Sequence, residues 1–295
     1  MIQTVREVAQ QVMDDARYVK IDANNISNTA KLIKELPKSS LEVPKPDWFQ
    51  LGQAGYGPMI DNYLVQYEVI AGSVNYCYWY GKSNIRPQGA SSTKMYQLLD
   101  ETITPEIGIF FNDGFIDKFY RKMVDARFPL LVERYMHLQE LIKTREHIAE
   151  VERNVLKEKD VNATIECLAR NYPGFGSDIF LNRAQLFVMQ IQKHLNVFDD
   201  DQIKQLTVPV GCQIPKILRN FGCIWYDHLL RLDVNNEKFI PKGSLREIEI
   251  RAATIVVCDM IAEQSGTNTM VVDNFLWQFR KEIDIPFHLT VTTDY

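Results

Sequence analysis

The chain has 295 residues, of which 46% are hydrophobic and 24% are charged. This composition is typical of a globular protein and excludes an intrinsically disordered chain. The net charge of −5 gives no general attraction to polyanions. We therefore expect no direct nucleic-acid partner and no membrane partner.

The cysteines and histidines argue against structural crosslinks. The five cysteines are odd in number and form no C-x-x-C pair, which disfavours a disulfide framework and a zinc ribbon. The five histidines form no H-E-x-x-H or H-x₃-H arrangement. At the N-terminus, charged residues interrupt any apolar signal-peptide core: Arg6, Glu7, Asp14 and Asp15. We expect a cytoplasmic, reduced protein with no metal and no cofactor.

Apolar residues recur every three to four positions through the first half of the chain, which predicts helices. One stripe begins at Val5, and a second runs from Ile60 to Val74 and ends in an aromatic segment at residues 75–80. Prolines at residues 37–46 predict a loop between them, and residues 85–92 are expected to form a loop that ends in a helix cap.

The second half continues the helical pattern. We expect one long helix from Pro129 to about Lys159, then helices at residues 161–170 and about 179–195, separated by a turn at residues 172–176. A short helix is expected at about residues 214–220.

The C-terminal part carries the best-defined helix start. Ser244 and Glu247 match a capping box, and the helix that follows is expected to end near Gly266. A last helix covers residues 272–279, and the weakly alternating tail at 285–291 is expected to be extended. The sequence therefore predicts an all-α fold with a single helical domain over residues 1–295.

Four segments in the same order resemble the queuosine salvage protein family. They are Asn75-Tyr76-Cys77-Tyr78-Trp79, the stretch 180–188 around Arg183-Ala184-Gln185, Ile214-Pro215-Lys216 with 247–253, and the run from 272 to 295. This resemblance implies queuosine 5′-phosphate N-glycosylase activity and a helical fold similar to helix-hairpin-helix DNA glycosylases. It also implies a buried pocket for a 7-deazaguanine base joined to ribose 5′-phosphate.

Cleavage of an N-glycosidic bond places positive charge on the ribose and negative charge on the departing base. A carboxylate beside the anomeric carbon stabilises the first charge, and a hydrogen-bond donor helps the base leave. The planar base favours aromatic faces, and the phosphate favours Arg or Lys.

The chain departs from the family pattern at several of these positions. The family's catalytic Asp falls on Gly211, within Gly211-Cys212-Gln213. A family Lys falls on Asn182, a family Asp falls on Gln190, and a base-contacting His has no counterpart before His137. Asp273 matches a family Asp, and Trp277 replaces an aromatic residue one turn later.

The resemblance therefore gives two sets of candidate residues. The catalytic positions are Asp273 and Gly211. The substrate-binding positions are Tyr76, Tyr78, Trp79, Asn182, Arg183, Val210, Gln213 and Trp277.

Each of these residues also has a structural interpretation. The aromatic residues could belong to the core, and Arg183 could form an ion pair between helices. Asp273 could lie in the first turn of a helix, where the helix dipole favours a negative charge. Glu249 and Arg251 are expected to form a structural pair.

Three functions remain open on the sequence. The first is hydrolysis of the N-glycosidic bond of queuosine 5′-phosphate or a related nucleotide, which releases queuine. The second is a non-catalytic relative that binds a nucleotide or nucleobase, with Gly211 in place of the Asp. The third is a helical protein used only for protein contacts. The first two share a small-molecule partner.

Overall fold

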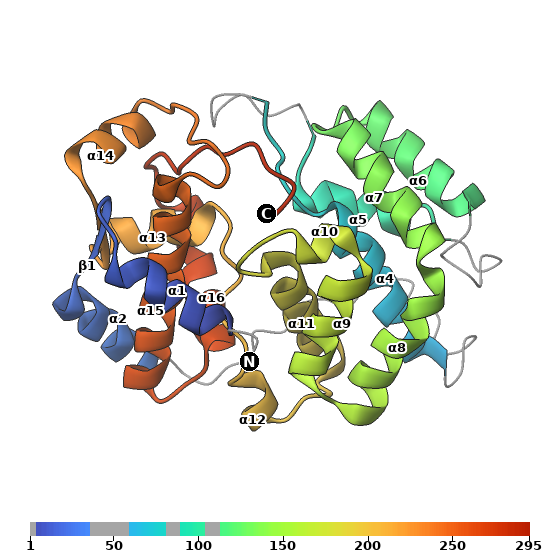
Figure 1. The fold of residues 1–295 in the computed structure, drawn as a ribbon, viewed down its shortest axis with the longest axis horizontal. Coiled ribbons are helices and arrows are strands. Elements are labelled where there is room, and N and C mark those ends of the chain that lie inside the picture. The colour runs from blue at the N-terminus through green and yellow to red at the C-terminus, as the bar shows by residue number, and fades with distance from the viewer. Residues whose placement is uncertain (1–3, 36–58, 81–88, 104–112) are drawn as a thin grey trace.

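The computed structural model describes residues 4–35, 59–80, 89–103 and 113–295 (Figure 1). The first helices are α1 (Val5–Asp14), α2 (Ala23–Glu35), α4 (Ile60–Val74), α5 (Ser92–Asp100), α6 (Asp113–Asp125) and α7 (Leu131–Lys143). There follow η2 (Arg145–His147), α8 (Ile148–Arg153), η3 (Asn154–Glu158), α9 (Val161–Asn171), α10 (Pro173–Gly176), α11 (Asn182–Leu195) and α12 (Asp200–Ile203). The last are α13 (Gln213–Asn220), α14 (His228–Asn235), α15 (Leu245–Ser265), α16 (Thr269–Gln278) and η4 (Phe279–Lys281).

The fold is all-α, as the periodicity predicts. The described strands are short: β1 (Val19–Ile21) pairs antiparallel with β2 (Ile224–Tyr226), with Lys20 opposite Trp225. The helix-hairpin-helix resemblance stays a prediction. None of the described helices combines the length and apolar character that a membrane crossing requires.

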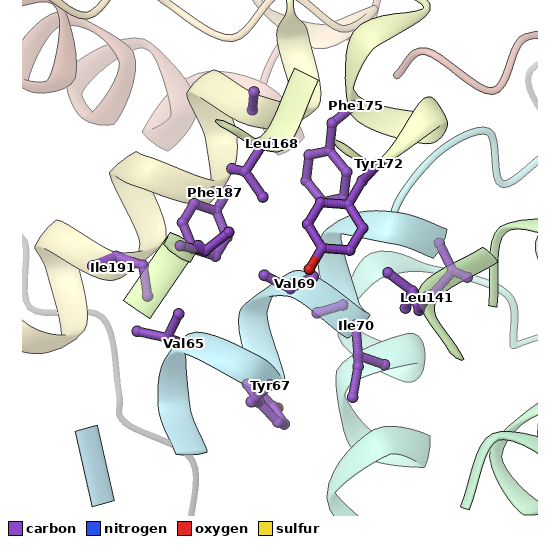
Figure 2. Packing of buried hydrophobic residues seen from close by; sticks show 14 of the residues in the cluster. Val65, Tyr67, Val69, Ile70, Leu141, Leu168, Tyr172, Phe175, Phe187 and Ile191 are labelled. Carbon is purple, nitrogen blue, oxygen red and sulfur yellow. The ribbon is translucent and has the colours of Figure 1, made fainter. Parts of the chain in front are cut away.

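The first hydrophobic core surrounds α4, and we call this part of the molecule the α4 lobe (residues 60–80, 89–103 and 113–206). Eleven of the fifteen residues of α4 are buried, so the helix is covered on most of its faces. Helices α7, α8 and α11 pack against it. Figure 2 shows Val65 and Val69 of α4 among side chains from distant segments, including Phe175 and Phe187.

The second core surrounds α15, and we call it the α15 lobe (residues 4–35 and 208–283). Helices α1, α2, α13 and α16 pack against α15, and the small sheet lies beside them. A capping box starts α1: Thr4 accepts from the backbone of Glu7, and the Glu7 carboxylate accepts from the backbone of Thr4. In Figure 1 the two lobes lie side by side, and the C-terminal tail ends between them.

The single helix expected from Pro129 to Lys159 is wrong. Helix α7 ends at Lys143, because the Thr144 hydroxyl donates to the Glu140 carbonyl over 2.7 Å and the chain continues in a 3₁₀ turn. A π-helical turn then ends at Lys159, whose φ of 54° is left-handed. The interruption comes from local side-chain bonding, which apolar periodicity does not record.

Other expectations need smaller corrections. The turn at residues 172–176 is the single helical turn α10, with Pro173 in its first position. Ser244 caps α15 and the helix ends before Gly266, but Glu247 accepts from the backbone of Gly243 instead of closing a box with Ser244. The tail forms one isolated bridge, from Leu289 to Phe239. The loop at 37–46 and residues 85–88 lie outside the described residues.

Candidate functional site

The aromatic segment that follows α4 lies at the junction of the lobes. A buried apolar cluster joins Tyr76, Cys77 and Trp79 to Cys212, Phe287 and Leu289. The Trp79 and Phe287 rings meet edge to face, with centroids 5.5 Å apart. The backbone N–H of Cys77 donates to the Tyr295 carbonyl over 3.0 Å. We define the interlobe site by Tyr76, Trp79, Arg183, Gly211 and Tyr295.

Arg183 is a buried cation that leaves part of its bonding capacity unused. It is the second residue of α11 and 1% exposed. Its Nη1 donates to the Ser73 carbonyl over 2.7 Å, and the guanidinium lies 5.0 Å from the centre of the Tyr76 ring. Within the described part of the chain, Nε and Nη2 have no hydrogen-bond partner. Burial lowers the pKa of Arg183 to about 10, so it stays charged at neutral pH and suits an anionic ligand.

A glycine makes room for this guanidinium. A Cβ at Gly174 would lie 2.7 Å from Nη2 of Arg183, closer than side-chain carbons pack. Beside Gly174 and Ser73 is a cavity of about 10 Å³, also bordered by His137. Burial lowers the pKa of His137 to about 4, which keeps the imidazole neutral. The cavity holds about one water molecule, so a larger ligand that reaches Arg183 must displace side chains.

Three more buried polar atoms near the junction have no partner among the described residues. They are the Tyr76 hydroxyl, Nε1 of Trp79 and Oδ1 of Asn182. Burial raises the pKa of Tyr76 above its usual value, so its hydroxyl stays protonated. Buried polar atoms in folded proteins nearly always have partners, and a group of unpaired ones is typical of a ligand site. Of the sequence-predicted residues, Tyr76 joins Trp79 in the junction cluster and packs against the Arg183 guanidinium, and Asn182 precedes Arg183 in α11.

Gly211 faces the C-terminal aromatic side chain. A Cβ on Gly211 would lie 3.9 Å from Cδ2 of Tyr295, which is ordinary contact. The carbonyl of Val210 accepts from Nε of Arg251 over 3.3 Å, and Gln213 begins α13. The structure therefore places Gly211 and Val210 at the interlobe site, with Gln213 at the start of the adjoining helix.

A network of buried charges that was not among the sequence predictions supports the site. Arg251 is 2% exposed and donates to both oxygens of Asp178 over 2.9 and 2.5 Å. It also donates to Glu247 over 3.3 Å, and its guanidinium lies over the Tyr295 ring. Burial alone would raise the pKa of Asp178, but Arg251 outweighs it and the pKa is lowered. The four-residue spacing from Glu247 to Arg251 was the available signal.

The structural pair expected between Glu249 and Arg251 is wrong. Glu249 accepts from three backbone N–H groups at residues 17–19, over 2.6 to 3.1 Å. Residues two positions apart on a helix point to different sides, so Glu249 anchors the start of β1 while Arg251 faces the other lobe.

Asp273 and Trp277 lie apart from the interlobe site. Asp273 is partly buried, which raises its pKa to about 6, and the cation that opposes this rise is Lys193. Lys193 comes ten residues after Arg183 in α11, about 15 Å along the helix. Trp277 is 44% exposed and stacks on Arg280 at 5.0 Å. The catalytic role of Asp273 stays a prediction that its position does not favour.

Tyr78 packs against both the junction cluster and the core of the α4 lobe. Its hydroxyl donates to Oδ1 of Asn75 over 2.7 Å, and its ring meets Phe128 edge to face at 5.8 Å. Half-buried against these neighbours, Tyr78 supports the aromatic segment. A direct contact with a ligand stays a prediction.

No three Asp, Glu, His or Cys side chains gather closely enough to hold a metal ion in the described ranges. The polar side chains of the interlobe site are instead a guanidinium, two phenols and an indole, and Asn182 adds an amide beside them. These groups recognise anionic and hydrogen-bonding ligands.

The described residues thus form an all-α protein with a buried, partly unsatisfied polar site between two lobes. The family model described as queuosine salvage protein matches residues 58–295. The chain belongs to the queuosine salvage protein family. The match includes all five residues that define the interlobe site.

Curated relatives agree with this assignment. The chain is 24% identical to a queuosine 5′-phosphate N-glycosylase/hydrolase from Sphaerobacter thermophilus, over 99% of this chain and 97% of that protein. It is 33% identical to the protein of the same name from Dictyostelium discoideum, over 39% of this chain and 40% of the relative. The Nematostella vectensis protein of that name is 24% identical over 60% of this chain and 62% of its own length.

Proposed function

We propose that this chain binds queuosine 5′-phosphate, or a related nucleotide, at the interlobe site and hydrolyses its N-glycosidic bond to release queuine. The observation that carries the proposal is the buried Arg183 guanidinium, whose Nε and Nη2 have no partner among the described residues. A buried cation with free donors is costly unless a ligand completes its bonds. The family membership supplies the class of ligand.

Each side chain of the site has a role in this proposal. Arg183 binds the 5′-phosphate through the free edge of its guanidinium. The Trp79 ring stacks on the base, and its Nε1, the Tyr76 hydroxyl and Oδ1 of Asn182 complete hydrogen bonds to the nucleotide. The cavity beside Gly174 is too small for a nucleotide, so binding requires the side chains around it to move.

Turnover is proposed to be slow. The ribose gains positive charge as the bond to the base breaks, and a fixed negative group is usually the largest single contribution to catalysis. Gly211 offers no such group at the position where the family carries its Asp. Water in that space does not carry a compensating charge.

The second candidate is a non-catalytic relative that binds a nucleotide or nucleobase. The contact between Gly211 and the Tyr295 ring favours it, because the ring fills space next to the position of the family carboxylate. Both candidates predict binding, and only the first predicts queuine release.

The deciding experiment incubates the chain with queuosine 5′-phosphate and detects free queuine by mass spectrometry. An excess of protein over nucleotide makes a single slow turnover visible. The matched control is Arg183→Met, which removes the cation from the site and should abolish release. Binding without release from the wild type would favour the second candidate, and absence of binding would contradict both.

The remaining assignments follow from this proposal. Because the site takes residues from both lobes, we propose that residues 1–295 act as one domain. A small-molecule substrate of this kind is consistent with a cytoplasmic protein that needs no direct nucleic-acid or membrane partner.

A further inference from the structure

Three buried carboxylates surround the interlobe site, and two of them are fully engaged. Both oxygens of Asp178 accept from Arg251, and each also accepts from a backbone N–H group. Glu247 accepts from Tyr295 and Arg251 through Oε1, and from a backbone N–H through Oε2. Each oxygen of these two carboxylates already accepts at least one hydrogen bond. The third is Asp294.

Asp294 is hydrogen-bonded through one oxygen of its side chain. Its Oδ1 accepts from Nζ of Lys242 over 2.8 Å and from the Ser177 hydroxyl over 3.1 Å. Across the described ranges, Oδ2 receives no hydrogen bond. The residue is 4% exposed, and its charge acts on both Arg183 and His137. The Asp294 carboxylate is therefore buried, held by two donors and close enough to Arg183 and His137 to interact with them electrostatically.

The backbone of Asp294 is also hydrogen-bonded to Asn182, the residue before Arg183. Its carbonyl accepts from Nδ2 of Asn182 over 3.3 Å, while Oδ1 of the same amide has no partner in the described part of the chain. The next residue, Tyr295, places its ring against Gly211. Asp294 thus lies between the unsatisfied polar atoms and the position that lacks a carboxylate.

We propose that Asp294 is the negatively charged catalytic residue of this chain and stabilises the ribose cation in place of a carboxylate at residue 211. This inference rests on the proposed hydrolysis. As the bond from the anomeric carbon to the base nitrogen breaks, its electron pair goes to the base, which takes a proton from solvent. Water adds its oxygen to the anomeric carbon and gives its proton to Asp294, which passes it to solvent.

The test is a single-turnover measurement of queuine release, with protein in excess over queuosine 5′-phosphate. Asp294→Asn should lower the rate constant about 100-fold or more, because the amide keeps the shape but not the charge. Asp284→Asn, at an exposed carboxylate in the same tail, should match the wild type. Added formate should restore part of the rate to Asp294→Ala, and no purely structural role predicts such a rescue.

The outcomes separate this inference from the function on which it rests. Wild-type release that persists at the same rate in Asp294→Asn would overturn the role of Asp294 and leave the hydrolysis standing. No release from the wild type would overturn both. If the amide variant does not fold, Asp294→Glu serves instead: it keeps the charge but displaces it, and its rate must fall for the inference to hold.

Discussion

The Tyr295 ring lies against Gly211, so that a Cβ on the glycine would come within 3.9 Å of Cδ2 of the ring. The backbone of Gly211 is not in the left-handed region, so an L residue fits there without strain. Residue 211, where the family resemblance implies a catalytic Asp, can therefore accept an aspartate side chain.

The Tyr295 hydroxyl is expected to stabilise the junction. It donates to Oε1 of Glu247 over 3.0 Å and lies 3.2 Å from Nε2 of His288. Tyr295→Phe removes this hydrogen bond from Nε2 of His288 and leaves Oε1 of Glu247 with Arg251 as its donor. The loss should lower the free energy of unfolding by about 1–3 kcal/mol. Urea unfolding followed by circular dichroism measures this change. A loss within experimental error would show that the hydroxyl contributes no net stability.

Arg251 should be essential for the stability of the fold. Arg251→Met leaves the buried Asp178 and Glu247 without their shared cation, so the free energy of unfolding should fall by about 3–5 kcal/mol. The double variant with Asp178→Asn should be less destabilised than the sum of the two single variants, because one uncompensated charge is gone. Denaturant unfolding of all three variants tests this coupling, and strict additivity would contradict it.

Arg183 should make the site bind queuosine 5′-phosphate more tightly than unphosphorylated queuosine. Arg183→Lys keeps a cation but loses the planar fork, so the dissociation constant for queuosine 5′-phosphate should rise about tenfold or more, on the order of 1.4 kcal/mol. The dissociation constant for unphosphorylated queuosine should change much less. Isothermal titration calorimetry with both ligands measures the difference, and Arg170→Lys at the surface is the control. Equal losses for both ligands would place the phosphate elsewhere.

The stability of the chain should depend on pH through Asp273. Burial raises its folded pKa to about 6 from an ordinary 3.8, so the folded state holds the proton more tightly than the unfolded state. At pH 4 the buried Asp273 carboxyl is protonated in the folded state and costs little stability. As pH rises to about 6 it becomes charged, and the free energy of unfolding falls progressively. Asp273→Asn should therefore gain about 2 kcal/mol relative to the wild type between pH 4 and pH 7. Urea unfolding across this range tests it, and a constant difference would contradict it.

The helices were predictable where the pattern is local. The apolar stripes of α1 and α4 and the Ser244 cap of α15 follow from neighbouring residues alone. The pairing of β1 with β2 was not predicted, because its strands are separated by most of the chain and are three residues long. The break at Thr144 depends on one hydroxyl, which carries no periodic signal.

The site was predictable only in part, because its contacts join residues that are far apart in the sequence. Family resemblance indicated Arg183 and Trp79, and the fold brings both to the junction. The bonds from Arg251 to Asp178 connect residues 73 positions apart, which no spacing rule records. Asp273 matched a family residue by order along the chain, but order does not determine which face of α16 meets the site.

The most direct test of the account compares queuine release from queuosine 5′-phosphate by the wild type, Gly211→Asp and Gly211→Asn under identical conditions. We predict slow release by the wild type and a gain of about 10²–10³ in the aspartate variant, because the variant adds a fixed negative charge at residue 211 to that of Asp294. The asparagine variant adds the same bulk without charge and should show no such gain. Robust release by the wild type, with no gain from Gly211→Asp, would show that Gly211 does not limit catalysis in this chain.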